Sequence, residues 1–162
     1  MSSLTRYEFS SEWLVDASPD EAYAALHDLA SYPKWWPEVK EAHKIDEDRF
    51  VLRCRSFLPY DLIFETARGV EDPEARILEA KMTGDLEGFS RWTITAHGKG
   101  ARIVFDEVVI TNKKLLNAIA PVARPAFKAN HAVMMRHGLR GLKTFLAGYR
   151  LAREGERAEG AE

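Results

Sequence analysis

The spacing of apolar residues changes once along this chain, and that change restricts the possible fold more than any other feature. From about Val39 to Asn112, apolar and polar residues alternate in several short segments, which is the two-residue period of β-strands. Short turn-forming stretches such as Gly84-Asp85 and His97–Gly100 separate these segments, and strands joined by short turns form antiparallel meanders. From Lys113 onward the spacing is helical and predicts one long C-terminal helix of about seven turns.

Two further elements are predicted before the meander. From Tyr7 to Val15, aromatic and apolar residues occupy alternate positions, which predicts a first, half-buried strand. The segment Ser18–Glu21 has a serine, then a proline, then a glutamate three residues after the serine, which is typical of a capped helix N-terminus. We expect a short helix from about Pro19 to Asp28, followed by a single turn at residues 31–37, where prolines forbid a longer helix.

The alternation also predicts which strand residues face inward. One set of alternate positions is mostly apolar, whereas the other set carries charged residues such as Arg53 and Arg91, so we expect the first to form the concave face of a curled sheet. The inward set comprises Phe50, Leu52, Cys54, Ser56, Tyr60, Leu62, Phe64, Thr66, Leu78, Ala80, Met82, Ser90, Trp92 and Ile94. The strand from Ile103 to Ile110 is apolar at both sets of positions, which leaves the orientation of Asp106 and Glu107 open.

At 162 residues the chain is long enough for one domain that buries both a core and a pocket. We expect that single domain to span residues 1–151. The last residues, 152–162, are small and charged and have no apolar period, so they are predicted to form a disordered charged tail.

The charge balance and the single cysteine restrict the partners and the compartment. The 23 Lys and Arg residues and the 25 Asp and Glu residues are interspersed, so nucleic acid is not an expected partner. Cys54 is the only cysteine, which allows no internal disulfide and fits a reducing, cytoplasmic setting. The first residues show no basic patch followed by an apolar run, and no stretch of about 18 uncharged apolar residues occurs. We therefore expect neither secretion nor a membrane span.

The sequence shows no recognisable catalytic or metal-binding motif. His131 and His137 lie six residues apart, His-Glu-x-x-His is absent, and the other histidines fall in separate elements, so we predict no metal and no cofactor. Without a Gly-x-Ser-x-Gly motif or a neighbouring base, nucleophilic catalysis is not indicated, and Cys54 is better explained as a small core residue.

Three motifs carry a resemblance to a known family. They are Ser18–Tyr23, Asp28 with Tyr32–Pro37, and Trp92 before the hairpin Gly98–Ile103. Together with the order of elements, they resemble the helix-grip fold of the START and Bet v 1 (SRPBCC) superfamily, which includes bacterial polyketide cyclases and dehydrases, over about residues 5–150. The resemblance implies an α+β fold in which a curled seven-stranded antiparallel sheet wraps round the long C-terminal helix, with two short helices after the first strand. It also implies a START-like ligand-binding domain with a cavity between sheet and helix for a lipid, polyketide, isoprenoid or similar molecule.

Candidate ligand-binding residues follow from the inward strand positions and from one stripe of the C-terminal helix. Phe127, His131 and Met134 share that stripe, and strand residues such as Tyr60 and Trp92 are expected to face them. The predicted set is Trp13, Cys54, Tyr60, Phe64, Met82, Trp92, Asp106, Phe127, Asn130, His131 and Met134. For the polar members the plainer interpretation is internal hydrogen bonding, because an unpaired buried polar group is costly.

Three functions stay open at this point. A binding or carrier protein for a small hydrophobic ligand needs no catalytic residue and is the preferred hypothesis. The alternative is a polyketide cyclase or aromatase, in which His131 or Asp106 removes a proton next to a ketone and Tyr60 or a serine hydroxyl stabilises the enolate. The third is a protein that presents a ligand to a membrane or a partner protein and is marked by an exposed apolar patch. We expect a monomer or a homodimer.

Overall fold

The computed structural model describes residues 5–112, 114, 117 and 120–160. The elements follow in the order β1 (Arg6–Val15), α1 (Pro19–His27), the 3₁₀ turn η2 (Leu29–Ser31), α2 (Tyr32–Trp35), β2 (Val39–Lys44), β3 (Arg49–Cys54), β4 (Leu62–Asp72), β5 (Ile77–Gly84), β6 (Leu86–His97), β7 (Gly100–Thr111) and α4 (Ala120–Gly160). The fold is therefore α+β, as predicted.

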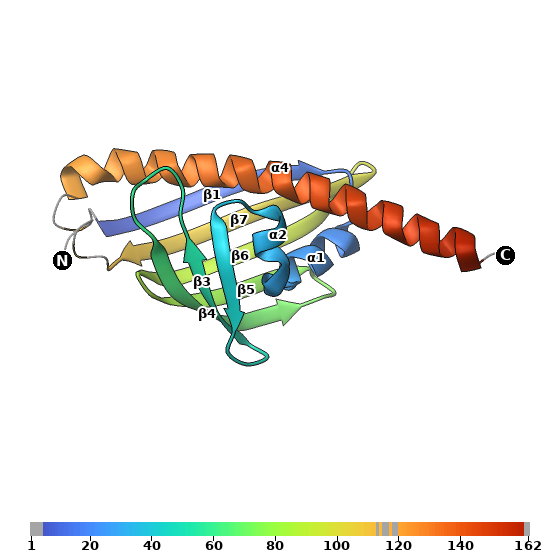
Figure 1. The fold of residues 1–162 in the computed structure, drawn as a ribbon, viewed down its shortest axis with the longest axis horizontal. Coiled ribbons are helices and arrows are strands. Elements are labelled where there is room, and N and C mark those ends of the chain that lie inside the picture. Colours follow the sequence, from blue (N-terminus) through green and yellow to red (C-terminus); the bar gives the residue numbers. More distant parts are fainter. Residues whose placement is uncertain (1–4, 113, 115–116, 118–119, 161–162) are drawn as a thin grey trace.

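The seven strands form one antiparallel sheet in the order β1-β7-β6-β5-β4-β3-β2. Strands β2 to β7 pair with their neighbours in sequence, and β1 pairs with β7 at one edge. Figure 1 shows α4 running along the sheet beside β1, while β2 and β3 curve round in front. The predicted helix-grip arrangement, a curled sheet round a long helix with two short helices after the first strand, is confirmed.

Helix α1 begins as its sequence motif predicts. Ser18 is the N-cap residue, and its Oγ accepts a hydrogen bond from the backbone N–H of Glu21 at 3.1 Å. The Glu21 carboxylate in turn accepts one from the backbone N–H of Ser18 at 3.4 Å, which completes the capping box. Helix α1 ends at His27, and the proline-containing segment after it forms only short turns, as predicted.

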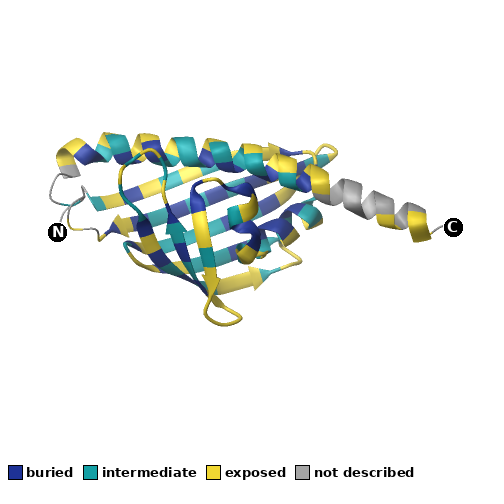
Figure 2. Ribbon diagram, in the orientation of Figure 1, coloured by how far each residue is buried: buried dark blue, intermediate teal, exposed yellow. Residues whose placement is uncertain are grey.

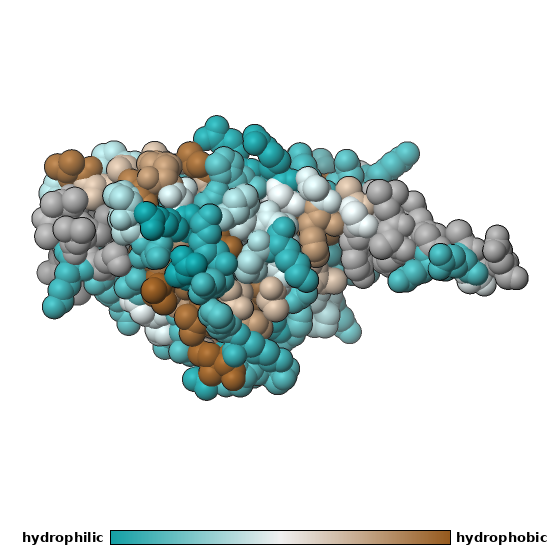
Figure 3. Space-filling model, viewed as in Figure 1, coloured by the Kyte–Doolittle hydropathy of each residue, from teal (hydrophilic) through white to brown (hydrophobic). Residues whose placement is uncertain are grey.

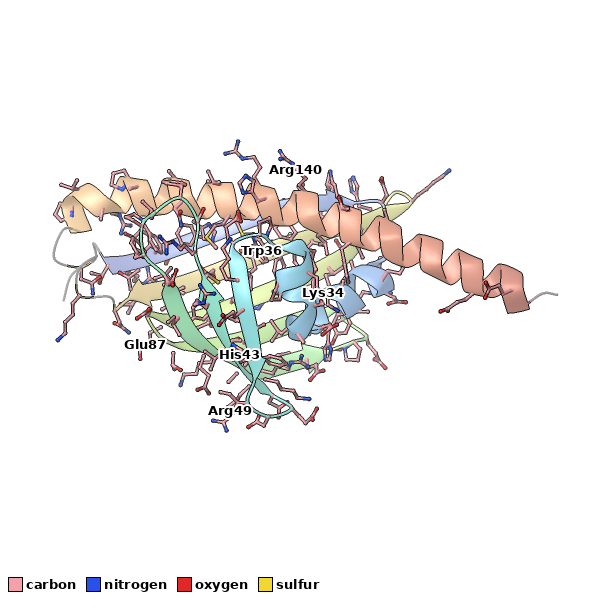
Figure 4. The ribbon with its side chains drawn as sticks, viewed as in Figure 1. Lys34, Trp36, His43, Arg49, Glu87 and Arg140 are labelled. Atoms are coloured by element: carbon pink, nitrogen blue, oxygen red, sulfur yellow. The ribbon has the colours of Figure 1, made fainter. Side chains whose placement is uncertain are left out.

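The segment around α2 rests on α4 because two glycines of α4 leave room for it. Trp36 points toward α4 (Figure 4) and donates its indole N–H to the backbone carbonyl of Met134 at 2.8 Å. A Cβ at Gly138 would lie 2.7 Å from the Trp36 ring, and a Cβ at Gly141 would overlap the carbonyl oxygen of Trp35. These approaches require residues without side chains and fix α2 against the middle of α4.

One hydrophobic core joins the sheet to the helices. Buried and exposed residues alternate along the strands, as Figure 2 shows. Among the most deeply buried side chains are Tyr7 of β1, Leu26 of α1, Ile94 of β6, Ile103 of β7 and Leu142 of α4. The alternation predicted from sequence therefore positions the concave face against α4.

Helix α4 extends further than predicted. It continues to Gly160, through the segment where we expected a disordered tail. That segment is rich in Ala, Arg and Glu, which are strong helix formers, and extending an existing helix carries no nucleation cost. Although α4 has 41 residues, neither it nor another helix within the described ranges is apolar enough to cross a membrane.

Candidate functional site

A cavity lies between α4 and the concave face of the sheet. Its volume is about 140 Å³, close to the roughly 150 Å³ of an engineered apolar cavity that holds benzene. Most of its wall is apolar and includes Leu52, Phe64, Met82, Trp92 and Phe105. An aromatic ring or a short hydrocarbon chain fits within this space, and because the cavity is partly open to solvent, a longer molecule can extend out of it.

Most of the predicted site residues meet at this cavity. Its lining includes Cys54, Phe64, Met82, Trp92, Phe127, Asn130, His131 and Met134. The predicted wall between the helix stripe and the inward strand positions thus exists as a continuous surface, which α4 and strands β3 to β7 supply. Whether these residues bind a ligand stays a prediction.

Three predicted residues, Trp13, Tyr60 and Asp106, lie away from the lining. Trp13 is buried and packs against Trp92 and Trp36, with ring centroids 5.2 Å and 5.7 Å away, so it supports the wall from within the core. Tyr60 precedes β4, which begins at Leu62, so the strand alternation did not apply to it. Burial raises the pKa of Tyr60 to about 12, and its hydroxyl has no hydrogen-bond partner among the residues that the structure describes.

The structure corrects the prediction for β7, because Asp106 does not line the cavity. Asp106 pairs in register with Ser10 of β1 and accepts a hydrogen bond from its hydroxyl at 2.8 Å, on the exposed face of the sheet. Glu107 instead faces inward and lines the cavity. The register of the β6–β7 hairpin could have indicated this orientation. Its tight turn pairs His97 with Gly100 and hence Trp92 with Phe105. The inward orientation of Trp92 therefore extends to Phe105 and, two residues on, to Glu107.

Glu107 and His131 are the two ionisable groups at the centre of the wall. The Nε2 atom of His131 lies 3.7 Å from Oε1 of Glu107, and their side chains are 14% and 11% exposed. Burial raises the pKa of Glu107 to about 8 and lowers the pKa of His131 to about 4, since both charged forms lose water. At pH 7 the pair is therefore neutral and is not a salt bridge.

The surroundings of this pair combine apolar contacts with unused hydrogen-bonding capacity. The His131 ring stacks on Phe9 of β1, with a centroid distance of 3.7 Å and an interplanar angle of 8°. Ser90 of β6 stands opposite Glu107 in the sheet and also lines the cavity. The Oδ1 atom of Asn130 is buried without a hydrogen-bond partner in the described part of the chain. These polar groups are available to a molecule inside an otherwise apolar space.

The thiol of Cys54 in the cavity wall has low reactivity. Burial raises the pKa of Cys54 to about 12, and the nearby carboxyl group of Glu107 adds to the effect. A thiol that stays protonated is a poor nucleophile and a poor metal ligand. Within the described residues, no three His, Cys, Asp or Glu side chains gather in a way that could hold a metal ion.

A second set of charged groups lines the cavity from β4 and the end of α1. Arg68, whose side chain is 15% exposed, donates to the backbone carbonyl of His27 at 2.6 Å and lies 3.5 Å from Glu71. The ring of His27 also contacts Glu71. Sequence reasoning missed Arg68, although it follows Leu62, Phe64 and Thr66 at alternate positions of the same strand. Its charge is already matched by protein groups.

The surface shows small separate apolar patches in a largely hydrophilic face (Figure 3). The exposed large apolar residues of the described chain are Leu14, Ile45, Phe57, Ile63, Val70, Ile110 and Val122. They come from β1, the turn after β2, the loop after β3, and from β4, β7 and α4. Among the described residues, these side chains do not identify a docking patch, so they give no support to the hypothesis of ligand presentation to a membrane.

Comparison with known proteins identifies both a family and a fold. The family described as polyketide cyclase / dehydrase and lipid transport matches residues 6–147. A protein of Thermus thermophilus, TTHA0849, has a similar structure with a TM-score of 0.77 at 15% identity, covering 88% of this chain and 99% of that one. Comparison with curated protein sequences gives no match.

Two further solved structures share the fold. The Zhui aromatase/cyclase of Streptomyces sp. R1128 aligns with a TM-score of 0.71 at 13% identity, covering 88% of this chain and 94% of that one. A START superfamily protein of Mycobacterium smegmatis aligns with a TM-score of 0.69 at 17% identity, covering 89% of this chain and 98% of that one. At such identities the likeness concerns the fold, and it does not distinguish a carrier from a cyclase.

Proposed function

Because the chain belongs to the polyketide cyclase/dehydrase and lipid transport family, we propose that it binds a small hydrophobic molecule in the cavity between its sheet and α4. The observation that carries the proposal is the cavity itself, whose wall is mostly apolar and is built from both layers of the fold. A cytoplasmic location and a monomeric or homodimeric state are further predictions.

Apolar burial supplies the expected affinity. Each 100 Å² of apolar ligand surface removed from water contributes roughly 2.5 kcal/mol before the costs of association are subtracted. The few polar groups on the wall, among them Ser90 and Glu107, would then set the orientation of the ligand. No step in this function needs an activated nucleophile or a metal.

Binding of a neutral apolar dye tests the proposal. We expect N-phenyl-1-naphthylamine to bind with enhanced fluorescence and to be displaced by lipids, quinones or polyketide mimics. Ala80→Phe places a ring in the cavity wall and should weaken binding severalfold, whereas Ala147→Phe, on the exposed side of α4, is the matched control. Equal dye binding by the two variants would argue against the cavity as the binding site.

A second candidate function, cyclisation of a polyketide, is favoured by the Glu107–His131 pair. Neutral His131 can accept a proton next to a ketone, and protonated Glu107 can donate a hydrogen bond to the enolate oxygen. The low pKa of His131 makes it a weak base, which is why binding is the first proposal. Hydrogen–deuterium exchange next to the carbonyl of a bound ketone tests this chemistry. Exchange that does not fall in His131→Phe would exclude His131 as the base.

A further inference from the structure

Glu107 lines the cavity and has no hydrogen-bond partner among the described residues. Among the described residues its only recorded polar contact is the 3.7 Å approach to His131, which is too long for a hydrogen bond. A carboxyl group buried without a partner costs folding free energy. Because Glu107 lines the cavity, a molecule in the cavity can supply the partner that the protein does not.

We propose that Glu107 donates a hydrogen bond to a neutral carbonyl group of the bound molecule, so that the cavity selects hydrophobic ketones and similar carbonyl compounds over carboxylates. The inference rests on the proposed function, since it names the ligand class for the same cavity. Ser90, opposite Glu107 on β6 and on the same wall, adds a hydroxyl donor beside it.

The groups that face Glu107 allow it to remain protonated. His131 approaches from α4 and Cys54 from β3, while the residues opposite Glu107 on the two neighbouring strands, Phe9 and Ser90, do not titrate. Burial raises the pKa of Glu107 to about 8 and lowers that of His131 to about 4. Below pH 8 the carboxyl group therefore carries a proton that it can donate.

Among the described residues, no lysine or arginine side chain lies beside Glu107 to pair with an anionic ligand group, and His131 is neutral at neutral pH. The guanidinium of Arg68 comes from β4, three strands away in the sheet, and it already contacts His27 and Glu71. A carboxylate at Glu107 would lose its water without gaining an ion pair. A ketone loses less on leaving water and gains the hydrogen bond, so the neutral compound is preferred.

Cumene, acetophenone and benzoate have nearly the same shape but differ in polarity and charge. Comparing them separates the contribution of apolar burial from that of the carbonyl hydrogen bond and from the cost of a negative charge. We would titrate each at pH 6.5 into the wild type and into Glu107→Leu, Glu107→Gln and Asp106→Asn, following the indole N–H signal of Trp92 by NMR. Trp92 lines the cavity, and Asp106 is the adjacent carboxylate on the opposite face of the same strand. Leucine removes the donor, glutamine keeps an N–H donor that does not titrate, and asparagine is the matched control.

The proposal predicts that Glu107→Leu weakens acetophenone binding about fivefold, as expected for one net hydrogen bond, and leaves cumene binding unchanged or tighter. Glu107→Gln should stay within about twofold of the wild type for acetophenone, and Asp106→Asn should match the wild type for all probes. Benzoate should bind the wild type at least about tenfold more weakly than acetophenone. Raising the pH through 8 should weaken acetophenone binding in the wild type but not in Glu107→Gln.

Each contrary result has a distinct meaning. If cumene binds and acetophenone responds to Glu107→Leu no more than cumene does, the carbonyl contact is refuted while the proposed function stands. Benzoate binding as tight as that of acetophenone refutes the selection of neutral ligands. If neither cumene nor acetophenone binds the wild type, the proposed function fails, and this inference fails with it.

Discussion

Replacing Glu107 with glutamine should change how the stability of this protein depends on pH. Burial raises the pKa of Glu107 from the ordinary 4.5 to about 8 in the folded state. Between these two pH values the folded protein holds a proton that the unfolded chain has released, so the free energy of unfolding falls as the pH rises. The slope is about 1.4 kcal/mol per pH unit, which gives at most about 5 kcal/mol over the whole window.

The lowered pKa of His131 has the opposite effect on the free energy of unfolding, and it acts over a lower pH range. Burial lowers its pKa from 6.5 to about 4, so between these values the unfolded chain binds a proton that the folded protein does not, and stability rises with pH. In the wild type the two slopes cancel between about pH 4.5 and 6.5, and from 6.5 to 8 only the loss due to Glu107 remains, about 2 kcal/mol. In Glu107→Gln stability should rise to pH 6.5 and then stay level.

Urea unfolding followed by tryptophan fluorescence between pH 5 and 8.5 measures these profiles. The informative quantity is the difference between variant and wild type, because contributions from other groups cancel in it. Asp106→Asn is the control, since it removes the adjacent carboxylate on the exposed face of β7. If wild type and Glu107→Gln lose stability in parallel between pH 6.5 and 8, Glu107 is not protonated in the folded protein and the reasoning is refuted.

Three further predictions concern packing and capping. Met134→Ala, at the cavity wall, should cost less than the roughly 2–5 kcal/mol of an ordinary core truncation, and dye affinity should change more than stability does. Gly141→Ala should cost at least about 1–3 kcal/mol in urea unfolding, because its methyl group would overlap the Trp35 carbonyl; Gly148→Ala, with open space around it, should instead gain up to about 1 kcal/mol. Ser18→Ala should cost about 1 kcal/mol and lower the melting temperature, and no loss would contradict the capping box.

The parts of the fold that could be predicted from sequence are those with short-range causes. The capping motif at Ser18 involves atoms within four residues, so it can be recognised from the sequence alone. Strand alternation depends only on the direction of successive side chains, and it placed Cys54, Phe64 and Trp92 on the cavity wall. The helical stripe of His131 and Met134 follows from the same kind of local geometry.

The errors fall where a residue's position depends on how its element pairs or packs with another element. The orientation of β7 is set by its pairing with β6, which the apolar run from Ile103 to Ile110 conceals, so Asp106 was chosen in place of Glu107. Trp13 does face the core, but Trp92 and Trp36 fill the space between it and the cavity. Which buried aromatic side chain touches a cavity is a matter of tertiary packing, and periodicity carries no information about it.

The polar pair at the cavity wall is also the strongest argument that the wall has a function beyond packing. Neither Glu107 nor His131 gains a hydrogen bond from the described part of the protein, and burial opposes the charged form of each. Apolar residues of similar size at both positions would remove that cost and would be expected to stabilise the fold. A pair that lowers stability, faces a cavity and keeps its hydrogen-bonding capacity free is best explained by a molecule that the cavity is built to hold.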